Sequence, residues 1–102
     1  MNVVLTDIAK KRLKSIFSYY RRKGMTKTGQ KIRINVLKKA KLLRKQPLIG
    51  QIEENLKSLN QGHRYLVVSN YKILYRIIDK TVFITDIFDT RQDPNKMKIK
   101  DD

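Results

Sequence analysis

The chain has 102 residues, the size of one small domain with a single core, and its net charge is +15. Such an excess destabilises a compact fold by self-repulsion, so we expect an acidic partner. With no Cys and one His, the sequence excludes a disulfide framework, a thiol nucleophile and cysteine-ligated zinc, and we expect neither a metal nor another cofactor.

The first half of the chain predicts a strand and a helical hairpin. Residues 2–5 predict a short strand, and either Thr6 or Asp7 is positioned to cap the helix that follows. Gly24 ends this helix, and a second helix begins at Thr26 or Thr28 and ends at residue 46, before a proline. Apolar residues at helical spacing form one stripe on each helix: Leu13, Ile16, Phe17 and Tyr20, then Ile32, Val36, Ala40 and Leu43.

The basic residues are concentrated in this half. Residues 1–52 carry 15 Lys and Arg and a single acid, Asp7, whereas residues 53–102 carry 9 basic and 8 acidic side chains. Ordinary solvated helices mix the two signs, which favours a binding role for these helices. No apolar run approaches the ~18 residues of a membrane span, and no apolar signal segment begins the chain. We therefore expect a cytoplasmic protein without a membrane partner.

The second half changes to a period of two, which is typical of strands. Residues 48–59 predict a loop with a short helical turn at 52–56, and strands are predicted at 65–68, 71–78 and 82–88. Ser69-Asn70 and Asp79-Lys80 fit two-residue hairpin turns. The expected fold is therefore α+β: an N-terminal strand, a helical hairpin and a three-stranded antiparallel meander. We expect one domain over residues 1–90 and a C-terminal tail over 91–102.

The two turns determine which side chains share a face of the meander. The apolar face should bury against the helices, and it includes Ile73, Tyr75, Ile84, Phe88 and one acid, Asp86. The other face combines basic, aromatic and hydroxyl side chains and is the candidate functional surface: His63, Tyr65, Val67, Lys72, Leu74, Arg76, Phe83 and Thr85.

Four basic residues are candidates for binding an anionic group of a target: Arg64, Lys72, Arg76 and Arg91. Arginine suits this role because its planar donors match two oxygens at once. If the protein cleaves RNA, the candidate catalytic groups are His63, Tyr65 and Arg76, since cleavage needs proton transfer and stabilisation of developing phosphate charge. The alternative is that the charges are solvated, the histidine is merely exposed and the tyrosine packs against its neighbours.

Three segments resemble the RelE/ParE toxin superfamily. Residues 64–79, RYLVVSNYKILYRIID, resemble its signature strand pair. Residues 84–94, ITDIFDTRQDP, resemble its last strand and the Arg-x-x-Pro turn that follows. Pro47-Leu-Ile-Gly50 is similar to the connection after its second helix. The resemblance covers nearly the whole chain and agrees with the expected order of elements.

This resemblance implies the toxin of a type II toxin–antitoxin pair, of the kind that stabilises plasmids, neutralised by a cognate antitoxin. ParE-like members inhibit DNA gyrase, whereas RelE-like members are mRNA interferases that cleave mRNA on the ribosome. RelE-like members usually carry a Tyr or His near the C-terminus. This chain has no Tyr after Tyr75 and no His after His63, and Asp89 stands where many relatives carry His. We therefore expect a ParE-like, non-enzymatic inhibitor, with a RelE-like endoribonuclease or a plain nucleic-acid-binding module as alternatives.

Overall fold

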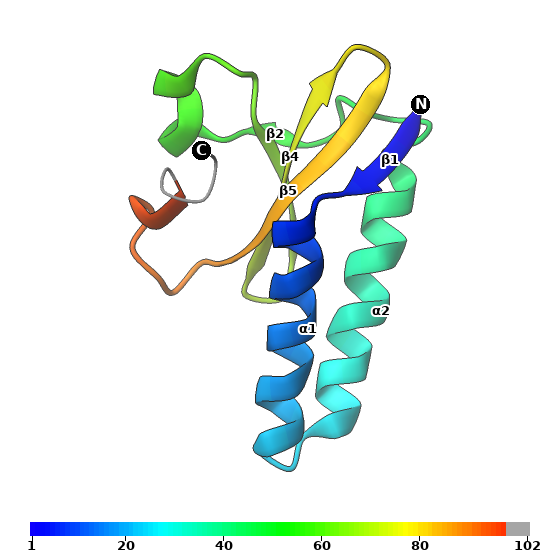
Figure 1. The fold of residues 1–102 in the computed structure, drawn as a ribbon, viewed down its shortest axis with the longest axis vertical. Helices are drawn as coiled ribbons and strands as arrows, with labels where there is room; N and C mark the ends of the chain where they lie inside the picture. Colours follow the sequence, from blue (N-terminus) through cyan, green and yellow to red (C-terminus); the bar gives the residue numbers. More distant parts are fainter. Residues whose placement is uncertain (98–102) are drawn as a thin grey trace.

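A computed structural model describes residues 1–97 as a five-stranded sheet with a helical hairpin against one face (Figure 1). The strands lie in the order β1 (Asn2–Leu5), β5 (Thr81–Asp89), β4 (Tyr71–Ile78), β3 (Arg64–Val68) and β2 (Gln51–Ile52), with β1 parallel to β5 and the other pairs antiparallel. The expected α+β class and the strand, hairpin, meander order are confirmed. Residues 98–102 of the expected tail lie outside the described residues. The helices are α1 (Asp7–Arg22), α2 (Thr26–Leu42) and the 3₁₀ helix η1 (Glu54–Leu59), which lies between β2 and β3 in the chain.

The expected helix starts are confirmed, and the end of the second helix is corrected. Thr6 caps α1, because its Oγ1 accepts a hydrogen bond from the Ala9 N–H at 3.2 Å. Gly24 follows α1 with φ +73°, a left-handed conformation that favours glycine. Helix α2 ends at Leu42, four residues before the expected position, because the chain then tightens into turns whose N–H groups bond three residues back.

The main core lies between the hairpin and the sheet. Ile73, Tyr75 and Ile84 are fully buried there against the apolar stripes of both helices, as expected. Phe17 is the exception among the stripe residues, because it is only half-buried. Both two-residue turns are confirmed by the pairing of residues 68 with 71 and 78 with 81.

A β-bulge in β5 alters the predicted faces. Leu74 pairs with Asp86 while Tyr75 pairs with Ile84, so Thr85 is an extra residue without a partner in the ladder. Beyond this point the alternation of side chains is shifted by one residue. Phe88 therefore leaves the main core and lies in a second cluster with Leu74, and its predicted place against the helices was wrong.

The face opposite the hairpin is covered by other parts of the chain. Four buried residues form a second core there, Leu56, Leu74, Phe88 and Met97, with Leu59 and Tyr65 packed against it. Leu56 and Leu59 belong to η1, and Met97 ends the described part of the C-terminal segment. Figure 1 shows η1 and this segment on the side of the sheet away from α1 and α2. The middle of the surface that the sequence presents as open is therefore occupied, while Val67 stays exposed.

Candidate functional site

Lys72, a candidate for binding an anion of a target, already forms an ion pair with a carboxylate of the protein itself. Its Nζ lies 2.7 Å from Oε1 of Glu53, whose side chain is 2% exposed. The same ammonium lies over the ring of Tyr65, 4.2 Å from its centroid. A buried carboxylate needs such a partner, because an unpaired charge in the interior is costly. In this structure Lys72 neutralises Glu53.

The Glu53–Lys72 pair also holds η1 on the sheet. The second carboxylate oxygen, Oε2, accepts hydrogen bonds from the backbone N–H of Asn55 at 3.2 Å and from its side-chain amide at 3.0 Å. Glu53 is thereby the N-cap of η1. The sequence places Glu53 and Lys72 19 residues apart, and no periodic pattern connects them.

The candidate catalytic side chains are buried, half-buried or hydrogen-bonded to another side chain of the protein. His63 is 2% exposed, and its carbonyl accepts from the Glu53 N–H at 2.9 Å. The Tyr65 hydroxyl donates to the side-chain oxygen of Gln51 at 2.9 Å. Arg76 is half-buried opposite Phe83, and its Nε is buried without a hydrogen-bond partner among residues 1–97. A substrate on this face does not reach His63 without displacing protein.

Arg64 holds the Pro47–Gly50 connection. Its Nη1 donates to the Gly50 carbonyl at 2.8 Å and to the Leu48 carbonyl at 3.4 Å. The buried Tyr75 hydroxyl accepts from the Gly50 N–H at 2.9 Å and donates to the Pro47 carbonyl at 2.8 Å, and burial raises the pKa of Tyr75. A Cβ on residue 50 would lie 2.6 Å from this hydroxyl, so the position requires glycine.

Two arginines are paired with aspartates at the α1 side of the sheet. Arg91 makes two hydrogen bonds to Asp89, from Nε at 3.0 Å and from Nη2 at 2.8 Å, and this partner lowers the pKa of Asp89. Arg12 of α1 donates from Nε to Asp86 at 3.2 Å. The Arg91–Asp89 pair and Arg12 border a cleft, which is lined by Arg12, Ser15, Ile16, Tyr19, Tyr71, Asp89, Arg91 and Gln92. Arg91 lies here, away from the residues of the second core.

Asp86 gives a pH-dependent prediction. Burial raises the pKa of this carboxyl above its usual 3.8, although Arg12 opposes the shift. Above pH 3.8 the folded state then binds protons more readily than the unfolded state, so this group makes stability fall as pH rises. Replacing Asp86 with Asn should remove that contribution. We expect the unfolding free energy of the wild type to fall relative to that of Asp86→Asn as pH rises, in urea titrations from pH 4 to 6.

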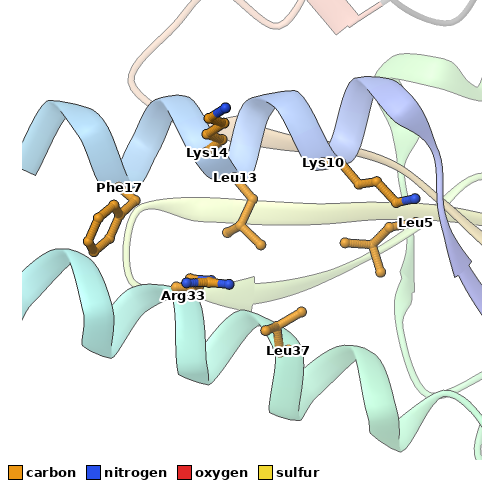
Figure 2. A pocket seen from close by; sticks show the side chains of 7 residues that line it. All are labelled: Leu5, Lys10, Leu13, Lys14, Phe17, Arg33 and Leu37. Carbon is orange, nitrogen blue, oxygen red and sulfur yellow. The ribbon is translucent and has the colours of Figure 1, made fainter.

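The feature that sequence reasoning missed is an apolar groove between α1 and α2. Leu5, Leu13, Phe17 and Leu37 line it, and Lys10, Lys14 and Arg33 stand beside them. Figure 2 shows the leucines converging in the gap between the two helices. A signal was present, because Phe17 and Leu37 are large apolar residues that the main core leaves partly uncovered. The groove fits an amphipathic segment whose polar side carries acids.

Within residues 1–97, no group of three His, Asp or Glu side chains is arranged to hold a metal ion. No helix of that described part is long and apolar enough to cross a membrane.

Comparisons with known proteins agree with the geometry. Residues 3–94 match the family model described as the ParE toxin of the type II toxin–antitoxin system, parDE. Among solved structures, a chain of the chromosomal ParDE toxin–antitoxin system from P. aeruginosa is similar, with a TM-score of 0.70 and 20% sequence identity. That match covers 85% of this chain and 92% of the other. A comparison with curated proteins gives no match.

Proposed function

Because the chain belongs to the ParE toxin family of type II toxin–antitoxin systems, we propose that it inhibits DNA gyrase by binding to it. Its partner within such a system is a cognate antitoxin. Under this proposal the protein catalyses no reaction, and its effect on the target comes from an interface.

The observation that carries the proposal is the covered face of the sheet. An mRNA interferase needs a proton-transfer group within about 3 Å of the reacting oxygen, and that group must be reachable by the substrate. Here His63 is buried, Lys72 is bound to Glu53, and the second core fills the middle of the face. Binding to a protein target requires no such group, so this arrangement supports inhibition over RNA cleavage.

The proposal is tested by two assays with the same purified protein. In the first, supercoiling of relaxed plasmid by gyrase is followed with increasing toxin. In the second, cleavage of mRNA on programmed ribosomes is followed under matched salt conditions. We expect loss of supercoiling and intact mRNA. Cleaved mRNA with unaffected supercoiling would replace the proposal with the RelE-like function.

We further propose that the antitoxin binds the groove between α1 and α2 with an acidic amphipathic helix. The apolar floor matches the apolar side of such a helix, and the three cations beside it match its acids. The opposite charges should accelerate association, and the acceleration should diminish with salt because screening acts beyond ~8 Å at physiological ionic strength.

Leu37→Glu should weaken antitoxin binding by about 30-fold or more, since it places a charge in the desolvated centre of the interface, where hot-spot changes cost at least ~2 kcal/mol. The matched control is Ile34→Glu, one turn earlier on α2, where the side chain is exposed and outside the groove. Isothermal titration calorimetry with the cognate antitoxin measures both. Equal loss in the two variants would contradict this position for the antitoxin.

A further inference from the structure

Four lysines form a row along the solvent side of α2. Lys27, Lys31, Lys38 and Lys41 are separated by four, seven and three residues, which places them on one helical face. All four are exposed, and the buried residues of α2 lie on the opposite side: Gly29, Ile32, Val36 and Ala40. The row, which we call the lysine ridge, is about 21 Å long at 1.5 Å per residue.

The lysine ridge carries uncompensated charge. Helix α2 contains no acidic residue, and within residues 1–97 none of the four ammonium groups forms an ion pair. Lysines three and four residues apart repel each other and destabilise a helix, whereas an interspersed acid would stabilise it. The repulsion is relieved when an anion binds, and a row of charges fits an anion that is itself a row of charges.

The ridge is separate from the groove assigned to the antitoxin. The side chains lining that groove include Arg33 and Leu37 of α2 but none of the four lysines. An antitoxin helix in the groove therefore leaves the charge of the ridge without a partner.

We propose that the lysine ridge binds the phosphate backbone of double-stranded DNA without regard to sequence. Lysine presents a compact point charge, which suits a phosphate, and it lacks the planar fork with which arginine matches two acceptors at once. Single strands are held by aromatic side chains that stack on bases, and the exposed residue at the centre of the ridge is the aliphatic Ile34. At ~3.4 Å per base pair, the ridge spans about six base pairs.

This proposal does not depend on gyrase inhibition. DNA binding by the ridge is measured with the toxin and a duplex alone, so its failure and the failure of the proposed function are distinguishable.

The test is fluorescence anisotropy with a labelled 20-base-pair DNA duplex, the same sequence as duplex RNA, and one single DNA strand. Four phosphate contacts predict a slope of about −3.6 for log affinity against log salt, so binding should weaken ~10²-fold between 50 and 200 mM salt. Changing all four ridge lysines to Gln should abolish most of this binding, because glutamine keeps helix propensity but removes the charge. Each single change should lower the slope by about 1.

The matched control changes four exposed lysines elsewhere, Lys11, Lys57, Lys80 and Lys96, to Gln, with the same loss of net charge. We expect it to retain most of the DNA affinity, and circular dichroism should show both variants folded. Equal loss in the two variants would overturn the proposal, since binding would then depend on net charge alone. Tighter binding to the single strand or to duplex RNA than to duplex DNA would overturn it as well.

Discussion

Replacing Ile73 with alanine is expected to lower the free energy of unfolding by about 2–5 kcal/mol, because it leaves a cavity at a site that cannot collapse easily. Ile73 is fully buried in β4, paired with Leu66 on one side and Ile87 on the other, and it belongs to the core beneath the helices. The loss would be a large part of the ~5–15 kcal/mol typical of a native domain. Urea denaturation followed by circular dichroism measures it.

Ile78→Ala is the control in the same strand. That side chain is 41% exposed, so the same change of residue should cost less than about 1 kcal/mol. A lower midpoint with an unchanged urea dependence would show that Ile73→Ala affects stability rather than the unfolded state. Equal costs at the two positions would mean that β4 does not face the helices as described.

Lys72→Met is expected to cost about 3–5 kcal/mol, the usual effect of removing one member of a buried ion pair. The reason is the carboxylate left behind, because Glu53 is 2% exposed and its Oε1 loses the ammonium at 2.7 Å. We also expect η1 to detach earlier than the rest of the fold in the variant, since Glu53 is its N-cap. Urea denaturation gives the stability, and hydrogen exchange of residues 54–59 reports on η1.

Two further variants make this test specific. The double change Lys72→Met with Glu53→Leu should recover much of the lost stability, because apolar replacement of a whole buried pair is often neutral. Arg91→Met removes the cation of an exposed pair, 59% exposed on the arginine side, and should leave stability nearly unchanged. If Lys72→Met left stability unchanged and abolished target binding, Lys72 would be the anion-binding residue that the sequence suggested.

The sequence predicted the structure correctly where the structure depends on residues that are close together in the chain. The spacing of Leu13 and Ile16 and the turn at Ser69-Asn70 depend on neighbours a few residues away, and the helices and hairpins follow from them. The bulge was invisible because Thr85 is a β-branched residue that suits a regular strand equally well. One extra residue then exchanged the faces of Phe88 and Ile87.

The candidate site was predicted less well because it depends on contacts between distant residues. Leu56 and Met97 meet across 41 residues to cover the second face, and neither lies in a periodic pattern. The basic candidates were chosen for their chemistry, whereas the partners that engage them come from other segments: Glu53 for Lys72, and Gly50 for Arg64. Composition alone does not distinguish a free cation from a paired one.

Because β1 pairs with β5, the first strand of the sheet has no partner until β5 has been translated. Asn2 pairs with Thr81, and the Thr6 N–H donates to the Ile84 carbonyl at 3.1 Å, so the first strand is completed by the last. At ~5–20 residues per second, a ribosome needs about 4–16 s between making these two strands. Leu5 lies in β1 and lines the groove between the helices, so that groove is finished only when β5 has been translated. The nascent chain therefore completes the groove that we propose for the antitoxin only after β5 has been made, together with the rest of the sheet.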